Sequence, residues 1–295
     1  MKPQQQFRGS PEPSIPSTET RMRATTATSI SIASDDRVFV LTGAGISAES
    51  GLPTFRADDG LWAGHRVEDV CTPKAWKRDP AGVWEFYSAR RAAAQKADPN
   101  PAHIALAELE ARLGDRFFLC TQNVDDLHER AGSVRLLHMH GELAKSRCGR
   151  ECGRLPIEDW LSYRTLDEVG HCICGALLRP HIVFFGETPL ERDRIQEQLA
   201  KATLMVVVGT SGSVYPAANF VHWARSSNAR TIYVGPERPL NASALLMWCR
   251  AKPAKCWQGS FKLSERSSED SFPLAIRSSP SPSVPAFTAI DSKMY

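Results

Sequence analysis

The stretch that most constrains this chain covers residues 37–56 and reads RVFVLTGAGISAESGLPTFR. Its apolar run, Val38–Leu41, predicts a buried strand, and Gly43 and Gly45 then turn the chain into a segment with helical potential. A strand, a glycine turn and a helix form the phosphate-binding unit of dinucleotide-binding folds, in which N–H groups at the helix start face the pyrophosphate. Gly43, Gly45 and Ala48 satisfy the pattern G-x-G-x-x-A, but a tight turn without a ligand explains so short a match equally well.

Strand and helix patterns alternate along most of the chain. Short apolar runs of strand type occur at Val38–Leu41, Phe117–Thr121, Leu204–Val208 and Thr231–Val234. Helical patterns occupy Ala81–Ala97, Ala102–Leu113 and Asp193–Ala202. This alternation predicts an α/β fold with a doubly wound, Rossmann-like parallel sheet flanked by helices. Gly43, Gln122 and Gly209 each follow a predicted strand, so a binding site is expected at the carboxyl edge of the sheet.

Four of the eight cysteines lie close together, in the order Cys148-x3-Cys152 and Cys172-x-Cys174. Four thiolates around one ion suit structural zinc, and such a site leaves no open position for catalysis. The tight second spacing makes His171 a possible substitute ligand, and four unpaired thiols are the alternative to a metal site. Because residues 141–180 also show little apolar periodicity, we expect a zinc module inserted there, which forms a smaller domain with the helical segment Ala81–Ala97.

The two ends of the chain, residues 1–34 and 259–295, are rich in Ser and Pro and are expected to be disordered. They bracket a domain expected at residues 35–258. The net charge of +3 is too small to indicate specific nucleic-acid or membrane binding, and no apolar run approaches the ~20 residues that span a bilayer. A cytoplasmic location is expected, or a mitochondrial one if the N-terminal tail is a transit peptide, against which Glu12 and Glu19 count.

Four stretches of the chain together resemble one known family. GAGISAESGLPTFR in the opening stretch is followed by TQNVDDLHERAG at residues 121–132, HMHGEL at residues 138–143 and RPHIVFFGE at residues 179–187. This order is similar to that of the sirtuins, which are NAD-dependent protein lysine deacylases. The resemblance covers about residues 35–240 and implies NAD and Zn²⁺ as cofactors and acylated-lysine proteins as substrates. Oligomeric state cannot be read from the sequence.

The resemblance also implies catalytic roles. His140 stands on the position of the family's catalytic histidine, and an imidazole that titrates near pH ~6.5 can take a proton from a ribose hydroxyl. Asn123 and Asp125 match residues at the nicotinamide ribose and nicotinamide pocket, where they can stabilise positive charge that develops on the ribose. The implied reaction starts with attack of the acyl oxygen on the ribose and departure of nicotinamide. It ends in free lysine and 2′-O-acyl-ADP-ribose.

The cofactor residues implied by the resemblance are Gly43, Ala44, Gly45, Ser47, Phe55, Arg56, Gln122, Asn123, Asp125, Gly209, Thr210, Ser211, Gly235 and Glu237. Phe55 is expected to cover the reacting ribose. The segment Gly235-Pro236-Glu237 departs from the family's Asn-x-Glu loop, which binds the adenosine ribose. Beyond Asn241 the family pattern is lost, so the last helix of the sheet domain is expected to be absent or altered.

The substrate residues implied by the resemblance are Val183, Phe184 and Gly186 for the peptide, which would add as an extended strand, and Tyr87 and Arg90 for the acyl group. The spacing of three residues puts Tyr87 and Arg90 on one face of a helix, where they could hold a carboxylate. A solvated Arg beside a core Tyr is the alternative. Tyr-x-x-Arg resembles the class III sirtuins, which remove succinyl, malonyl and glutaryl groups. Mono-ADP-ribosyl transfer and a catalytically weak NAD-binding regulator stay open as other functions.

Overall fold

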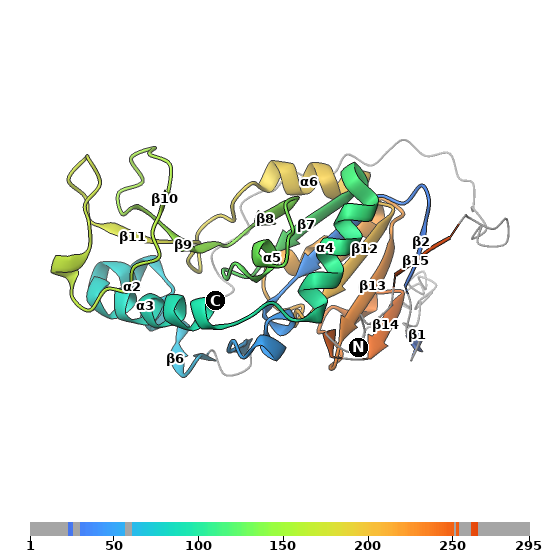
Figure 1. Ribbon diagram of the computed structural model, residues 1–295, viewed down its shortest axis with the longest axis horizontal. Helices are drawn as coiled ribbons and strands as arrows, with labels where there is room; N and C mark the ends of the chain where they lie inside the picture. The colour runs from blue at the N-terminus through green and yellow to red at the C-terminus, as the bar shows by residue number, and fades with distance from the viewer. Residues whose placement is uncertain (1–22, 26–29, 57–60, 251, 254–260, 265–295) are drawn as a thin grey trace, which may run out of the picture.

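The computed structural model describes residues 23–25, 30–56, 61–250, 252–253 and 261–264 (Figure 1). The helices are α1 (Val67–Val70), α2 (Pro73–Arg78), α3 (Pro80–Lys96), α4 (Pro101–Leu113), α5 (Leu127–Arg130), α6 (Arg192–Lys201) and α7 (Phe220–Ser226). The strands are β1 (Arg23–Thr25), β2 (Ile30–Ala33), β3 (Val38–Thr42), β4 (Phe55–Arg56), β5 (Leu61–Trp62), β6 (His65–Arg66), β7 (Phe117–Thr121), β8 (Leu136–His138), β9 (Gly141–Cys148), β10 (Ile157–Glu158), β11 (Leu178–Ile182), β12 (Leu204–Val208), β13 (Arg230–Gly235), β14 (Met247–Arg250) and β15 (Phe261–Ser264). Among the described residues, no helix combines the length and the apolar character that crossing a membrane requires.

The main sheet has seven strands in the order β1-β14-β13-β12-β3-β7-β8, and every neighbouring pair is parallel. Read from β8 to β14, this is the strand order 3-2-1-4-5-6 of dinucleotide-binding sheets. The predicted doubly wound parallel sheet is therefore confirmed. The direction of winding reverses between β3 and β12, and ligands of such sheets bind beside this reversal at the carboxyl ends of the strands.

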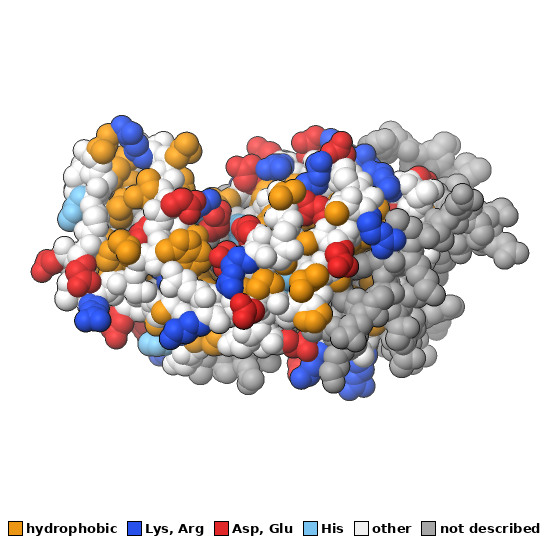
Figure 2. Space-filling model, in the orientation of Figure 1, with side chains coloured by type: hydrophobic (Ala, Val, Ile, Leu, Met, Phe, Trp, Pro, Cys, Tyr) orange, Lys and Arg blue, Asp and Glu red, His pale blue; other side chains and the backbone are white. Residues whose placement is uncertain are grey.

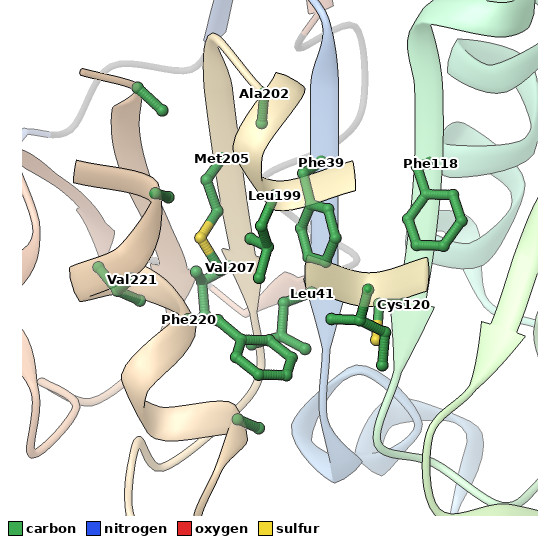
Figure 3. Close-up of a cluster of buried hydrophobic side chains, with 14 of the residues drawn as sticks. Phe39, Leu41, Phe118, Cys120, Leu199, Ala202, Met205, Val207, Phe220 and Val221 are labelled. Atoms are coloured by element: carbon green, nitrogen blue, oxygen red, sulfur yellow. The ribbon is translucent and has the colours of Figure 1, made fainter. Parts of the chain in front are cut away.

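Alternating side chains of the central strands enter two different cores. Phe39 and Leu41 of β3 point to the face covered by α6 and α7, where they pack with Leu199 and Phe220 (Figure 3). Their neighbours Val38 and Val40 face the opposite side, which α4 covers. Because both faces are covered by helices, these strands are apolar along their whole length, as the sequence pattern indicates.

A smaller part of the molecule lies beside the carboxyl edge of the main sheet (Figure 1). It consists of α1, α2 and α3 with the antiparallel sheet β10-β9-β11. Phe86 and Tyr87 of α3 share its core with Leu143 of β9 and Phe184, which follows β11. The smaller sheet covers almost the same residues as the zinc module predicted at 141–180.

Arg91 fastens α3 to this smaller sheet although its side chain is fully buried. Its guanidinium donates to the carbonyl oxygens of Leu143 and Leu161 at 2.8 and 2.7 Å, and it lies 3.2 Å from a carboxylate oxygen of Asp159. Burial lowers the pKa of Arg91, and the charge of Asp159 opposes that shift. The side chain is thus a buried cation with a complete set of partners.

Replacement of Arg91 by methionine is expected to lower the free energy of unfolding by about 3–5 kcal/mol, because Asp159 is left as a buried charge without its cation. Chemical unfolding would measure the loss. Arg90→Met is the matched control, since the neighbouring guanidinium has two buried nitrogens that find no hydrogen-bond partner in the described part of the chain. Similar stability losses in the two variants would contradict this account of Arg91.

Two sequence predictions, the helix after Gly45 and the disorder of both ends, differ from the structure. The segment after Gly45 forms two short 3-10 turns, at Ala44–Ile46 and Ala48–Ser50, and not an α-helix. Gly51 ends the second turn with a φ of 86°, and Pro53 follows two residues later, so the segment is too short for an α-helix.

The predicted disordered ends are also partly wrong. Ile30–Ala33 forms β2 and pairs in parallel with β15, which lies in the other predicted tail. Ile30 and Ile32 are buried in the core on the α4 side of the main sheet, so hydrophobic burial orders this segment. Residues 1–22 and 265–295 lie outside the described residues. After Asn241, where the last helix of the sheet domain is expected to be absent or altered, the chain forms strand β14 beside β13.

Candidate active site

The loops after β3 and β12 cross in direct contact at the winding reversal. Gly43 N–H donates to the carbonyl of Val208 at 3.0 Å, and Gly45 N–H donates to the carbonyl of Gly209 at 2.7 Å. A Cβ on Gly45 would lie 2.7 Å from that carbonyl oxygen, and Gly209 has a φ of 62°. The close contact between the two loops therefore already requires glycine at both positions. The close approach of a pyrophosphate, on which the sequence prediction rests, is not needed to explain them.

The loop after β7 joins the same place. Gln122 N–H donates to the carbonyl of Thr42 at 2.9 Å, and its side-chain amide donates to the hydroxyl of Thr210 at 3.1 Å. The structure therefore brings together the predicted cofactor residues of the loops after β3, β7 and β12. They form one polar surface at the carboxyl edge of the sheet, as the sequence predicts.

Ser47 connects the two predicted ribose-binding residues. Its hydroxyl accepts from the side-chain amide of Asn123 at 3.0 Å and donates to a carboxylate oxygen of Asp125 at 3.1 Å. All three residues are buried. Burial raises the pKa of Asp125 to about 6, so a proton competes for this carboxylate just below neutral pH.

His103 stands behind this group and was not singled out from the sequence. The backbone N–H of Asn100 donates to Nδ1 of His103 at 3.2 Å, which leaves Nε2 as the protonated nitrogen that faces the Ser47 hydroxyl at 3.4 Å. Burial lowers the pKa of His103 to about 4, so the ring is neutral. The start of α4 carried the available signal, because Asn100 and His103 form its capping box.

His140 lies in the turn after β8. Its Nδ1 is 3.1 Å from the carbonyl oxygen of Gln122, which can only accept a hydrogen bond, so Nδ1 carries the proton. Nε2 then has a free lone pair and can accept a proton. Burial lowers the pKa of His140 to about 4, against a smaller opposing effect of the Gln122 carbonyl, and the ring is neutral at physiological pH.

Tyr87 and Arg90 leave polar atoms without protein partners on one face of α3. The Tyr87 hydroxyl and the Nε and Nη1 of Arg90 are buried and, among the described residues, form no hydrogen bond of ordinary geometry, although the Cys71 thiol lies close to the Tyr87 hydroxyl. The guanidinium lies 5.0 Å above the ring of Phe86. Burial raises the pKa of Tyr87 and lowers that of Arg90. Buried polar groups are normally satisfied, so these atoms point to a ligand that the protein alone does not supply.

The predicted peptide segment follows β11 as extended chain and a turn. Val183 N–H donates to the carbonyl of His140 at 2.8 Å, and Phe184 N–H donates to the carboxylate of Glu187 at 2.8 Å. The ring of Phe184 is buried and stacks on Tyr87 with 6.2 Å between centroids, whereas Gly186 is exposed. A peptide pairing here would therefore use carbonyl oxygens of this segment, because these two N–H groups are already engaged.

The adenosine end of the predicted site is built differently from the family pattern. A Cβ on Gly235 would lie 2.3 Å from the hydroxyl of Tyr233, which donates to the carbonyl of Thr210 at 3.1 Å. The tyrosine hydroxyl thus fills the space of any side chain at position 235. Glu237 is exposed nearby, and Ser211 is exposed in the loop after β12. Of Phe55 and Arg56 the structure describes only the backbone, in β4.

The four cysteines of the smaller domain lie together, and their sulfur atoms are all within 4.8 Å of one another. The pairs Cys148–Cys174 and Cys152–Cys172 have Sγ–Sγ distances of 3.5 Å, too long for a disulfide. Tetrahedral zinc with Zn–S bonds of about 2.3 Å requires sulfurs about 3.8 Å apart, so the cluster fits that ion. His171 is not part of the cluster.

The comparisons with known proteins agree with this arrangement. The model of the Sir2 family matches residues 43–216. The NAD-dependent protein deacylase of Yersinia pseudotuberculosis is 55% identical over 203 residues, which cover 68% of this chain and 72% of that protein. The protein of the same name from Escherichia coli K12 is 54% identical over 204 residues, which cover 68% and 72%.

Two solved structures are similar to about three quarters of this chain. A complex of a Sir2 homologue with NAD is 40% identical with a TM-score of 0.68, and the match covers 75% of this chain and 86% of that one. A mutant Sir2 homologue in complex with ADP-ribose is 39% identical with a TM-score of 0.69, and the match covers 75% and 89%.

Proposed function

The chain belongs to the Sir2 family of NAD-dependent protein deacylases, and we propose that it removes succinyl, malonyl and glutaryl groups from lysine side chains as well as acetyl groups. The observation that carries the acyl preference is the buried pair Tyr87 and Arg90, whose polar atoms form no ordinary hydrogen bond to any residue that the structure describes. An acyl chain that ends in a carboxylate supplies what both residues lack. Its two oxygens accept from a guanidinium and from a hydroxyl at the same time.

The remaining site residues fit the deacylation chemistry. NAD supplies the ribose carbon that the acyl oxygen attacks and the ribose hydroxyls that receive the acyl group. Ser47 holds the side chains of Asn123 and Asp125 so that they can orient this ribose and stabilise positive charge on it. His140, neutral and with Nε2 as its basic nitrogen, can then take the proton of a ribose hydroxyl.

The zinc cluster holds the smaller domain together and takes no part in the chemistry, since four cysteine ligands leave the ion no open position. Acylated-lysine proteins are the proposed partners. On the face shown in Figure 2, Lys and Arg side chains are interspersed with Asp and Glu side chains. This mixture gives that face no extended basic surface for nucleic acid, and the expectation that the chain binds none stays a prediction.

Replacement of Arg90 by methionine is expected to reduce desuccinylation by about ten- to a hundred-fold, because a charged hydrogen bond contributes about 1.5–3 kcal/mol. Deacetylation should fall much less, since an acetyl group has nothing for the guanidinium to hold. Rates on two peptides that differ only in the acyl chain would measure this difference. A general folding defect lowers both rates together, so it cannot imitate the expected selectivity.

Equal losses on the succinyl and acetyl peptides would overturn the acidic-acyl proposal and leave Arg90 as a structural residue. Incorporation of labelled NAD into protein, without NAD-dependent release of acyl groups, would instead favour mono-ADP-ribosyl transfer. NAD binding without either reaction would favour the weak regulator. The presence of His140, Asn123 and Asp125 argues against the regulator, because the side chains that the proposed chemistry needs are all present in the chain.

A further inference from the structure

His138, the last residue of β8, is buried directly behind the loop that carries Asn123. It pairs in the sheet with Thr121, the residue from which that loop leaves β7. Its Nδ1 lies 2.8 Å from the backbone carbonyl oxygen of Asn123, and its Nε2 lies 2.7 Å from Oε1 of Glu129 on α5. Each ring nitrogen therefore has one close partner, on opposite sides of the ring.

Both partners of His138 are hydrogen-bond acceptors. The Asn123 carbonyl has no proton to donate, and the half-exposed Glu129 contributes a carboxylate oxygen, which accepts. A neutral imidazole has only one N–H and would leave one of these short contacts without a hydrogen. Two donors are present only in the imidazolium, so the geometry requires a charged ring. Burial lowers the pKa of His138, but the hydrogen bond and charge of Glu129 outweigh this effect and the pKa is raised.

The contact to His138 completes the restraint of Asn123. The backbone N–H of Asn123 donates to the hydroxyl of Thr121 at 3.0 Å, and its side-chain amide donates to Ser47 at 3.0 Å. With the carbonyl held by His138, every strong polar group of Asn123 except its side-chain oxygen is engaged. That oxygen is the one left to face the ribose. Asn123 can turn neither its backbone nor its amide without breaking one of these bonds.

We propose that His138 is a positioning residue that works as a permanent imidazolium: it fixes Asn123 through the backbone carbonyl, and its positive charge keeps the buried Asp125 carboxylate ionised. This role rests on the proposed deacylation, in which Asn123 and Asp125 act on the ribose. A buried carboxylate without a nearby cation takes up a proton, and a protonated Asp125 stabilises positive charge poorly. Burial raises the pKa of Asp125, the hydrogen bonds from Leu127 N–H and the Ser47 hydroxyl oppose this rise, and the positive charge of His138 adds to their effect.

The groups around His138 are mostly acidic. Glu129 and His128 face it from α5, Glu142 from β9 and Asp125 from the loop after β7. Burial lowers the pKa of His128 well below the ordinary value, so that ring is neutral and His138 carries the positive charge of the group. Among these side chains, only Glu129 is hydrogen-bonded to the His138 ring.

Glu129→Gln tests the proposal, because a glutamine amide can donate to Nε2 and no longer demands a charged ring. The change is at a half-exposed position and should leave the fold intact. In the resting protein, ¹⁵N NMR of the histidine rings at pH 8 should show two protonated nitrogens for His138. In Glu129→Gln, one of the two should lose its proton. This measurement does not depend on activity, so it stands even if the proposed deacylation fails.

The kinetic test is the pH profile of deacylation at saturating acyl peptide. Without the charge on His138, the pKa of Asp125 should rise, and the acid limb of kcat/KM for NAD should move upward by about one pH unit. Near pH 9, where Asp125 is ionised in both proteins, KM for the peptide should be unchanged. Glu142→Gln is the matched control, since it removes a neighbouring carboxylate that does not bond to the ring, and its acid limb should stay in place.

A neutral His138 ring at pH 8 in the wild-type protein would overturn the proposal. So would an acid limb that does not move in Glu129→Gln, or one that moves equally in Glu142→Gln. His138→Gln provides a second variant with the same expected upward shift and an additional loss in kcat of about ten-fold, because Asn123 then loses a charged hydrogen bond. Thermal unfolding of each variant would separate this loss from misfolding.

Discussion

His140→Ala is expected to reduce deacylation by about 10²–10⁴-fold, the usual contribution of a general base. NAD should still bind, because the crossing of the Gly45 and Gly209 loops does not involve the histidine. In the proposed reaction, nicotinamide release depends on Asn123 and Asp125, which Ser47 holds in place, so exchange of labelled nicotinamide into NAD should survive better than deacylation. Measuring both rates separates loss of the base from loss of the site.

The pH dependence gives the prediction a second check. Burial lowers the pKa of His140 to about 4, so His140 is an unprotonated base throughout the range from pH 5 to 9. The acid limb of the wild-type profile should therefore follow Asp125, whose pKa is raised to about 6. Activity should be present above that value and decline as the pH falls through it. An acid limb that remains unchanged when Asp125 is replaced would contradict this assignment.

His222→Ala is the matched control, since this histidine is exposed on α7 and far in sequence from the catalytic turn. It should deacylate at the wild-type rate. If His140→Ala also keeps a near wild-type rate with folded protein, His140 does not take part in proton transfer and the proposed role is wrong.

The sheet core is predictable from the sequence because its pattern is strong. Leu204–Val208 and Phe117–Thr121 are short, apolar and bounded by polar residues, which is typical of parallel strands covered on both faces. The parallel arrangement follows from the alternation of strands with helices, whereas the order of the strands in the sheet comes from the structure. Even the helix bounds at 80–96 and 101–113 lie within one residue of the predicted ends.

The terminal strands are not predictable in the same way. Ile30-Ser31-Ile32 offers only one period of alternation, and its surroundings are rich in Ser and Thr. β2 becomes a strand because it pairs with β15, more than 200 residues along the chain, and because its isoleucines complete a core built by other elements. Tertiary contacts decide such a segment, and no local pattern reports them.

The candidate site is likewise only partly predictable from the sequence. The residue types and their order in the chain single out His140, Asn123 and Asp125 as candidates, since each lies in a distinctive motif. The supporting partners are set by distance in space: Ser47 meets His103 from 56 positions away, and His138 meets Asn123 from 15. Tyr87 and Arg90 are intermediate, because their spacing puts them on one face but only the structure leaves their polar atoms without partners.

Loss of the metal is the second large effect that we expect. Cys148→Ser removes one of four thiolates from a cluster that fits zinc, and structural zinc sites have apparent binding free energies of about 10–16 kcal/mol. Zinc content should fall from about one ion per chain to well below one, and the smaller domain should lose its order. Metal analysis of freshly purified protein and thermal unfolding would measure both changes.

The functional consequence should fall on the peptide more than on NAD. Arg147, next to Cys148 on β9, donates to Glu187 at 2.8 Å, and the same carboxylate accepts from Arg179 at 2.7 Å and from the N–H of Phe184 at 2.8 Å. Disorder in the zinc module thus removes a partner from the carboxylate that shapes the proposed substrate segment, whereas the proposed NAD-binding loops belong to the main sheet. KM for the acyl peptide should rise several-fold more than KM for NAD.

Cys249→Ser is the matched control for the metal, because it makes the same chemical change at a buried cysteine of β14, outside the cluster. It should lower stability somewhat and leave zinc content at its wild-type value, since its sulfur lies in the core of the main sheet. Wild-type protein that is active and folded without zinc would contradict the metal site itself. Full zinc content in Cys148→Ser would instead mean that three thiolates and another ligand are enough, and that the order of the smaller domain does not depend on the fourth cysteine.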